Sequence, residues 1–173
     1  GVFTEANIGH FIQLANERNI PSVVDPKKKN FLSYVGCTLF KPNLKELKEG
    51  LKVEFADENL HAFEQAVAEL QKRLQTEQVL VTLSERGVFI ADGEEKTYIK
   101  AHRRSISDVS GAGDTVISIA SLCMALRTSV TFLAGLSNLG GGLVCEQVGV
   151  VPIDKQRLLQ EAMQLKLDKV NEQ

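Results

Sequence analysis

The sequence lacks an excess of either charge. Its 20 basic and 22 acidic side chains give a formal net charge of −2, whereas proteins that bind nucleic acids or anionic membranes usually carry a strong basic surplus. Only residues 27–29 form a basic run, which we interpret as a solvated loop. The sequence also lacks an uncharged apolar stretch of about 20 residues, the length that spans a bilayer. Composition therefore argues against a nucleic-acid-binding or membrane protein.

Cysteine and histidine are scarce as well. Cys37, Cys123 and Cys145 are far apart and have apolar neighbours, which indicates reduced, buried thiols in a cytosolic protein. The three histidines share no close spacing with one another or with cysteine, so we find no transition-metal motif. The first residues do not resemble a signal peptide. Because the chain starts without methionine and almost at once enters a helical pattern, we expect a fragment of a longer protein.

The chain has enough length and apolar content for one hydrophobic core. With 173 residues, of which 43% are hydrophobic, it can bury roughly two-thirds of its unfolded surface without disulfides or a metal. It contains no internal repeat, low-complexity tract or linker. We therefore predict a single domain over residues 1–173.

Apolar periodicity predicts helices alternating with strands. One helix is predicted after Thr4, its N-cap, from apolar residues at helical spacing: Ile8, Phe11, Ile12 and Ala15. A second helix is predicted over 57–75 from a similar stripe: Leu60, Phe63, Val67, Leu70 and Leu74. A further helix is predicted at 115–126, which carries no charge and is therefore expected to be buried over most of its surface. Two more are predicted at 131–146, which is almost uncharged, and at 154–170, which is amphipathic. Strands are predicted at 20–24, 37–40 and 79–83, before a hairpin of 87–91 and 96–99. This order predicts an α/β fold: a mostly parallel sheet flanked by helices, with an antiparallel hairpin.

Polar residues gather just beyond the first two predicted strands. Asp25 and Lys27 follow the first strand, and Asn43 and Glu46 follow the second. Open α/β sheets place ligands outside the carboxyl ends of their strands. We therefore regard these four residues as candidates for a binding site.

The stretch Asp108-Val-Ser-Gly-Ala-Gly-Asp-Thr115 carries the clearest chemical signal. Its small residues leave the amides of a helix N-terminus uncovered, and such amides, with the helix dipole, stabilise a phosphate. The same field would keep Asp114 ionised. A carboxylate beside an anion site can remove a proton from a hydroxyl that attacks a phosphoryl group. The residues alone predict an anion-binding turn with a candidate base.

Two other phosphate motifs do not fit this stretch. A dinucleotide fingerprint needs a third glycine three residues after Gly113, where Val116 stands, and the chain has no Gly-x-x-x-x-Gly-Lys loop. For an isolated Gly-x-Gly-Asp, a tight turn capped by aspartate is an equally good interpretation.

The surrounding residues resemble the ribokinase-like, or PfkB, family of carbohydrate kinases. The eight residues 108–115 are similar to its C-terminal signature, and three further matches occur in the family's order. These are Lys41-Pro-Asn-Leu-Lys-Glu46, similar to an Asn-x-x-Glu motif; Val81-Thr-Leu-Ser-Glu-Arg-Gly87; and Ser137-Asn138 followed by small residues and Val148-Gly149. Within the family, the 25–43 segment and the signature look most like the heptose 7-phosphate kinases.

The resemblance implies an ATP-dependent kinase with a role for each matched residue. Asp114 would be the general base, and Gly111, Ala112 and Gly113 would form an anion hole around the transferred phosphoryl group. Asn43 and Glu46 would hold Mg²⁺ through water. The phosphates or ribose of the nucleotide would contact Thr82, Ser84 and Gly87, and its adenine would lie near Asn138. Lys27 would contact an anionic group of substrate or nucleotide, and a solvated lysine is an equal alternative. For Asn43 and Glu46 the alternative is a helix cap and a surface residue.

Departures from the family pattern concern substrate class. Ser84 replaces a common glycine, and Ile119 replaces a common small residue, as in the heptose kinases. The resemblance matches only about the second half of such a kinase. Three alternatives therefore stay open: a kinase of a sugar phosphate, a nucleotide-binding fragment without catalysis, and a kinase of another sugar or nucleoside. Exposed sheet edges could pair chains into a homo-oligomer.

Overall fold

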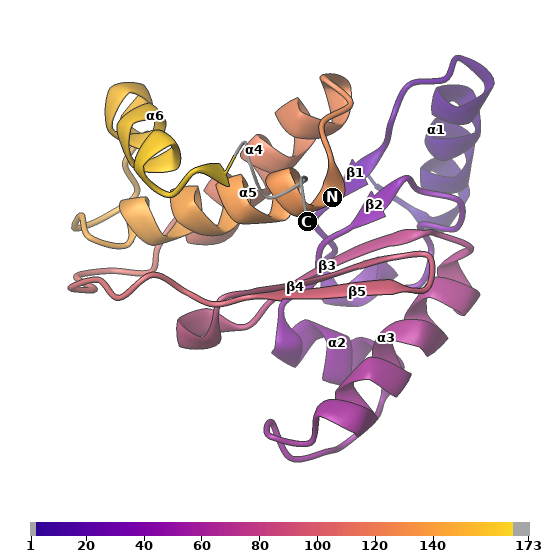
Figure 1. The fold of residues 1–173 in the computed structure, drawn as a ribbon. Coiled ribbons are helices and arrows are strands. Elements are labelled where there is room, and N and C mark those ends of the chain that lie inside the picture. Colours follow the sequence, from indigo (N-terminus) through magenta and orange to yellow (C-terminus); the bar gives the residue numbers. More distant parts are fainter. Residues whose placement is uncertain (1–2, 168–173) are drawn as a thin grey trace. The chain divides into compact units, whose positions relative to one another are not determined.

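The computed structural model describes residues 3–167, which form two compact units. The first unit lies within residues 1–82 and 91–96, and the second within 83–90 and 97–173. The expectation of a single domain stays a prediction. The helices and strands of the described residues (Figure 1) are α1 (Glu5–Glu17), β1 (Val23–Val24), β2 (Leu39–Phe40), α2 (Leu44–Leu51), α3 (Leu60–Leu74), β3 (Gln78–Thr82), β4 (Val88–Asp92), β5 (Glu95–Ile99), α4 (Ala112–Ala125), α5 (Val130–Val144) and α6 (Lys155–Gln164).

The strands follow the order β1-β2-β3-β4-β5 in one sheet. β2 runs parallel to β1 and to β3, with Phe40 opposite Val24 on one side and Val79 on the other. β4 and β5 are neighbours joined only by the turn at 93–94, so they form an antiparallel hairpin. The predicted α/β class, with parallel strands and a hairpin, is confirmed.

β1 and β2 are shorter than the predicted strands 20–24 and 37–40. At their amino ends side-chain and backbone bonds are mixed: the Ser22 amide donates to Thr38 Oγ1 over 2.9 Å, whereas the Thr38 and Leu39 amides donate to Ser22 O over 3.0 Å. The Thr38 hydroxyl thereby satisfies the Ser22 amide, a backbone donor that strand pairing would otherwise use. The two strands keep only two residues each in regular pairing.

The first unit is built around β2, β3 and the apolar faces of α2 and α3. α3 buries its predicted stripe except for Leu60, and the centre of the unit is almost completely closed to solvent at Leu39, Phe40, Leu47, Leu70, Leu74 and Val79. α3 begins at Leu60, three residues later than predicted. The reason is local: the Asn59 side chain accepts the Ala62 amide as an N-cap.

Two residues of the predicted stripes are exposed. Leu60 is 55% exposed in the first turn of α3, and Phe11 is 52% exposed on α1. The Phe11 ring lies edge-on against Phe3, with centroids 6.1 Å apart. α1 otherwise follows the prediction, because Thr4 forms a capping box with Asn7. Periodicity located both helices but overestimated their buried faces.

In the second unit, glycines bring α4 and α5 together. A Cβ on Gly140 would lie less than 3.0 Å from Ile119 Cδ1, and one on Gly141 would lie 2.8 Å from Val116 Cγ2. These glycines therefore serve helix packing. The expectation that α4 is buried over most of its surface is wrong: Leu122 is 65% exposed, because it falls outside the buried stripe of Val116, Ile119, Ala120 and Cys123.

Ion pairs hold α6 to the end of α5. The Arg104 guanidinium, only 8% exposed, pairs with Glu146 at 3.3 Å and with Glu161, and Arg157 pairs with the same two carboxylates. Two guanidinium groups sharing two carboxylates form a charge-assisted network. The helix predicted over 154–170 ends at Gln164, and residues 168–170 lie outside the described residues.

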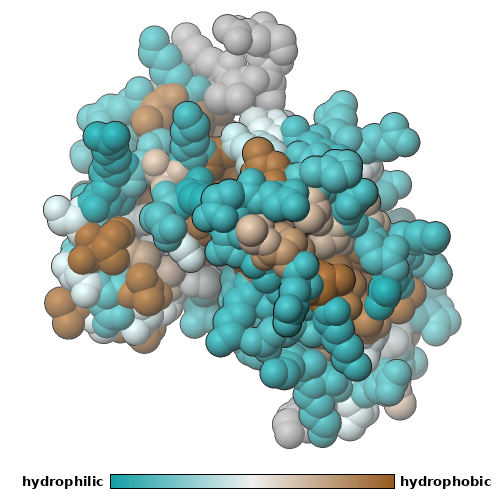
Figure 2. All heavy atoms as spheres, turned by 90° about the horizontal axis from the view of Figure 1, so that it is seen from below, coloured by the Kyte–Doolittle hydropathy of each residue, from teal (hydrophilic) through white to brown (hydrophobic). Residues whose placement is uncertain are grey.

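The three cysteines are buried and free, as predicted. Burial raises the pKa of the Cys37 thiol to about 11 and also raises the pKa of Cys123 and Cys145. No helix in the described part of the chain is both long enough and apolar enough to cross a bilayer. Figure 2 shows a face on which hydrophilic residues predominate and hydrophobic ones lie in small groups between them.

Candidate functional site

In the first unit, the carboxyl ends of β1, β2 and β3 bring predicted site residues to one edge of the sheet. Asp25 directly follows β1, Asn43 lies three residues after β2, and Thr82 ends β3. Asn43 and Thr82 form a parallel β-bridge, and the Thr82 amide donates to Pro42 O over 3.1 Å. The Lys41 amide donates to Val24 O over 2.8 Å. These backbone bonds hold the carboxyl ends of the three strands side by side, at the edge of the sheet where the candidate residues lie.

Asn43 and Glu46 form the capping box of α2. Asn43 Oδ1 accepts the Glu46 amide, and Glu46 Oε2 accepts the Asn43 amide, both over 2.8 Å. Each side chain still offers polar atoms that no hydrogen bond of the described residues uses. Mg²⁺ keeps several waters and takes few protein ligands, so this pair fits a cation held through water. No three His, Cys, Asp or Glu side chains among the described residues gather into a metal cage.

A charged cluster surrounds Asp25. Its two carboxylate oxygens pair with different lysines, Oδ1 with Lys41 Nζ at 2.8 Å and Oδ2 with Lys27 Nζ at 3.2 Å. The Lys27 side chain is 78% exposed, whereas the Lys41 side chain is only 4% exposed. The pKa of Tyr34 is raised by burial, with Lys27 lowering it and Asp25 raising it. Lys41 was not predicted as a site residue; its place between an apolar strand and Pro42 was the available signal.

In the second unit, the predicted signature forms a turn that leads into α4. Gly111, the N-cap, has φ +78°, a left-handed conformation that favours glycine. Asp108 fixes the turn, because its Oδ1 accepts the Ser110 amide and its Oδ2 accepts the Gly149 amide, each over 2.9 Å. Those amides, with Ser110 contributing most, lower the pKa of Asp108. Sequence reasoning gave Asp108 no role, although Asp-x-Ser is a common turn signal.

The amino end of α4 has no side-chain cap. Among the first helical amides, that of Ala112 reaches Val109 O over 3.3 Å. The amides of Gly113 and Asp114 have no acceptor among the described residues, and both residues are exposed. Uncovered amides and the positive end of the helix dipole can bind an anion. Asp114 lies in this first turn, so a carboxylate and an anion-binding terminus share one place.

Ser84 and Gly87 bracket a 3₁₀ turn that follows β3. Ser84 is exposed and has φ +54°, which explains why the resembled family commonly has glycine there. Gly87 has φ +96°, and a Cβ there would lie less than 3.0 Å from backbone atoms of Ile99 and Ala101. The structure thus gives Gly87 a packing role. The nucleotide contacts of Thr82, Ser84 and Gly87 stay predictions.

Asn138 lies on α5 and is only 9% exposed. Its Nδ2 donates to Lys100 O over 2.9 Å, which joins α5 to the segment after β5. This amide donor is therefore engaged within the fold, and an adenine contact of Asn138 stays a prediction.

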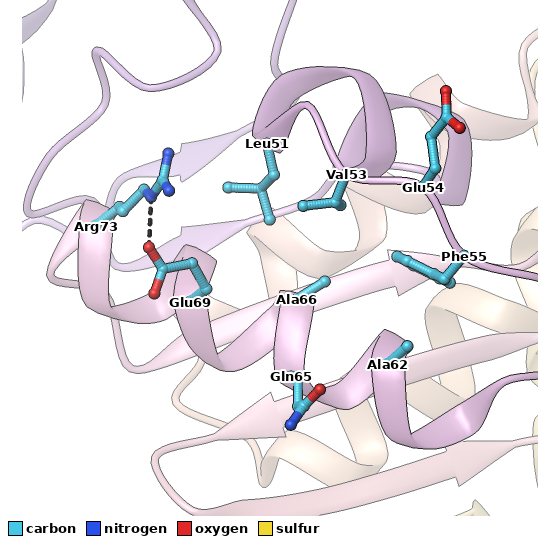
Figure 3. Close-up of a pocket in the computed structure, with 9 residues that line it drawn as sticks. All are labelled: Leu51, Val53, Glu54, Phe55, Ala62, Gln65, Ala66, Glu69 and Arg73. Carbon is cyan, nitrogen blue, oxygen red and sulfur yellow. Dashed lines mark hydrogen bonds and ion pairs between the residues drawn. The ribbon is translucent and has the colours of Figure 1, made fainter.

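A groove lies elsewhere in the first unit, between α2, the following segment and α3 (Figure 3). Leu51, Val53 and Ala66 line it, and the ion pair of Arg73 with Glu69, 2.6 Å long, closes one end. None of the predicted site residues lines this groove. It is therefore separate from the candidate edge.

Comparison with known proteins relates this chain to a family of carbohydrate kinases. Residues 2–156 match the family described as pfkB family carbohydrate kinase. The bifunctional protein HldE of Syntrophotalea carbinolica is 36% identical over 165 residues, which are 94% of this chain and 33% of that protein. The bifunctional protein HldE of Pseudomonas aeruginosa is 39% identical over 149 residues, 85% of this chain and 31% of that protein. The chain spans about a third of the length of these relatives.

Solved structures share the fold at low sequence identity. Phosphofructokinase-2 from Escherichia coli in complex with potassium superposes with a TM-score of 0.85 at 18% identity, covering 95% of this chain and 53% of that one. Arabidopsis thaliana ribokinase complexed with ribose and ATP gives a TM-score of 0.79 at 20% identity, covering 97% and 54%. The ribokinase-like fold expected from the motifs is thereby confirmed.

Proposed function

Because this chain belongs to the pfkB family of carbohydrate kinases, we propose that its protein transfers the γ-phosphoryl group of ATP to a sugar hydroxyl. The observation that carries this proposal is the uncapped amino end of α4, where uncovered amides and the Asp114 carboxylate share one helical turn. Phosphoryl transfer needs charge stabilisation and a base for the attacking hydroxyl, and this turn contains groups for both.

Asp114 is the general base of the proposed reaction. Its carboxylate takes the proton of the attacking hydroxyl, whose oxygen forms the new bond to the γ-phosphorus while the bond to the β-phosphate oxygen breaks and ADP leaves. Gly111, Ala112 and Gly113 form the anion hole. Because glycine has no side chain and alanine only a methyl group, a phosphoryl group can approach the backbone, where the amides stabilise the charge of the transition state.

Asn43 and Glu46 are the proposed magnesium-holding residues. Mg²⁺ would neutralise phosphate charge when bound. The capping box holds both side chains in place at the start of α2, and hard oxygen donors suit a water-mediated contact. Thr82, Ser84, Gly87 and Asn138 are the proposed nucleotide contacts, and Lys27 a contact for an anionic group.

The proposed acceptor is D-glycero-β-D-manno-heptose 7-phosphate, which would be phosphorylated at its anomeric hydroxyl. The support is the resemblance of the 25–43 segment and of the signature to heptose 7-phosphate kinases, together with the similarity to the HldE proteins. A kinase of this sugar would serve ADP-heptose formation for lipopolysaccharide. Another sugar or a nucleoside is the alternative acceptor.

The test compares wild type with Asp114→Asn in the natural full-length protein. ADP release is measured with Mg-ATP and the heptose 7-phosphate, and Mg-ADP affinity is measured by calorimetry. Loss of a general base lowers the rate by about 10²–10⁴-fold, and Mg-ADP affinity should change less than about twofold. Glu94→Gln, in the exposed turn after β4, is the matched control and should keep full activity.

Each outcome bears on a different part of the proposal. Turnover at the wild-type rate in Asp114→Asn would refute the role of Asp114. Turnover with another sugar but not with the heptose 7-phosphate would refute the acceptor and leave the kinase activity standing. A wild-type protein that binds Mg-ADP but turns over no sugar of a broad panel would refute the activity.

A further inference from the structure

Lys41 carries an ammonium group that the fold buries and uses only in part. Its side chain is 4% exposed, and Nζ pairs with Asp25 Oδ1 at 2.8 Å. Among the described residues this ammonium makes no hydrogen bond or ion pair with any other acceptor. An ammonium has three N–H donors, and burying a charge is costly unless those donors are satisfied. At least two of them are therefore available to a ligand.

Lys48 in the same unit shows how the fold satisfies a lysine with a structural role. Its Nζ donates to Phe55 O over 2.7 Å, pairs with Asp57, and lies 4.6 Å from the centroid of the Phe55 ring. Lys48 is also more exposed, at 23% of its side chain. The more deeply buried lysine thus has fewer partners, which is the reverse of what a purely structural role needs.

The only ion-pair partner of Lys41 among the described residues, Asp25, is shared with a second lysine. Asp25 is shared by Lys41 and Lys27, so two ammonium groups face one carboxylate. Tyr34 lies within electrostatic reach of Asp25 and Lys27 and can donate its hydroxyl to an anion. A carboxylate shared in this way neutralises the Lys41 ammonium only in part, and an anionic ligand would complete its neutralisation.

The position of the cluster favours a ligand as well. Lys41 follows β2 directly, and Asn43, which bridges to Thr82, lies two residues further on. This is the carboxyl edge of the parallel strands, where open α/β sheets bind their ligands. A lysine at such an edge binds a phosphate as a compact point charge.

We infer that the Lys41 ammonium, positioned by Asp25, binds a phosphate group of a substrate, either a phosphate of the nucleotide or the phosphate of a sugar phosphate acceptor. This inference rests on the proposed function, because it takes its phosphate ligands from that reaction. It adds Lys41 as a contact residue and Asp25 as a positioning residue.

The experiment measures binding by calorimetry in the natural full-length protein and in Lys41→Met. The ligands are Mg-ADP, the heptose 7-phosphate, and their counterparts without phosphate, adenosine and the heptose. We expect at least tenfold weaker binding of one phosphate-bearing ligand and a change below twofold for its counterpart. Weaker Mg-ADP binding identifies the nucleotide phosphate as the ligand, and weaker heptose 7-phosphate binding identifies the sugar phosphate. A merely structural lysine would not separate a ligand from its counterpart.

Two further variants complete the design. Lys48→Met removes a lysine of the same unit that already has its partners, and it should bind every ligand as the wild type does. Lys41→Gln keeps a polar side chain beside Asp25 but removes the ammonium charge. It decides the question if Lys41→Met does not melt cooperatively: weaker phosphate binding supports the inference, and wild-type binding overturns it.

The outcomes separate this inference from the proposed function. If the wild type binds both ligands and folded Lys41→Met binds them equally well, Lys41 does not bind phosphate and the inference alone fails. If the wild type binds neither ligand, the proposed function fails first and the inference falls with it.

Discussion

Replacing Gly50 by alanine should destabilise the first unit, although the same change usually stabilises a helix. Alanine is favoured over glycine inside a helix by about 1 kcal/mol. At Gly50 in α2, however, a Cβ would lie less than 3.0 Å from three ring atoms of Phe31, where ordinary contact begins at 3.4 Å. The ring would have to move by about 1 Å.

Phe31 has little room for such a movement. It is 4% exposed and lies edge-on against Phe40, with the ring centroids 5.1 Å apart and the planes at 89°. Overpacking a core costs about 1–3 kcal/mol and occasionally more. We take about 3 kcal/mol for the clash, the upper end of this range, and subtract the gain of about 1 kcal/mol from placing alanine in a helix. Gly50→Ala should therefore lower the free energy of unfolding by about 2 kcal/mol.

Gly9→Ala is the matched control, because Gly9 lies in α1 of the same unit and a Cβ there meets nothing within 4 Å. It should raise the free energy of unfolding by about 0.5–1 kcal/mol. Urea unfolding followed by far-ultraviolet circular dichroism measures both variants against wild type. A stabilised Gly50→Ala would refute the reasoning, since it would mean that the Phe31 ring yields without cost.

Three further changes test the second unit. The amides around Asp108 lower its pKa below the ordinary 3.8, so its ionised form stabilises the fold. Above pH 3.8 the urea midpoint of wild type should therefore be higher than that of Asp108→Asn, and this difference should disappear as the pH falls through the lowered pKa. A difference in midpoint that does not depend on pH would contradict this prediction. Gly87→Ala should lower the melting temperature by several degrees, since it combines a positive φ with a clash against Ile99 backbone. Glu161→Gln should lower the free energy of unfolding by about 1–3 kcal/mol and speed amide hydrogen exchange in α6, because buried Arg104 loses a charged acceptor. Unchanged exchange would mean that the ion-pair network does not hold α6.

Elements that depend on local chemistry could be predicted from the sequence. Thr4 begins α1 because its side chain and that of Asn7 satisfy each other's amides, and this information lies within four residues. The hairpin likewise follows from the turn at Asp92-Gly93. The signature turn before α4 could be located because its small residues and Asp114 are contiguous.

Features that depend on distant residues could not be predicted in this way. Lysine is rarely buried, and the burial of Lys41 depends on Asp25, sixteen positions away. The second bond of Asp108 joins it to Gly149, 41 positions away. The exposure of Leu122 was missed for another reason: residues 115–126 carry no charge, so no charged stripe marks the outer face of this helix.

The buried cysteines make this chain convenient for single-site labelling. A thiol reacts as the thiolate and only where a reagent can reach it, and Cys37, with a pKa of about 11, meets neither condition at neutral pH. Cys123 and Cys145 are protected in the same way. One cysteine introduced on the surface could therefore carry a fluorophore or spin label while the three native thiols stay in place, and a pair of such labels, one in each unit, would report the distance between the units as ligands bind.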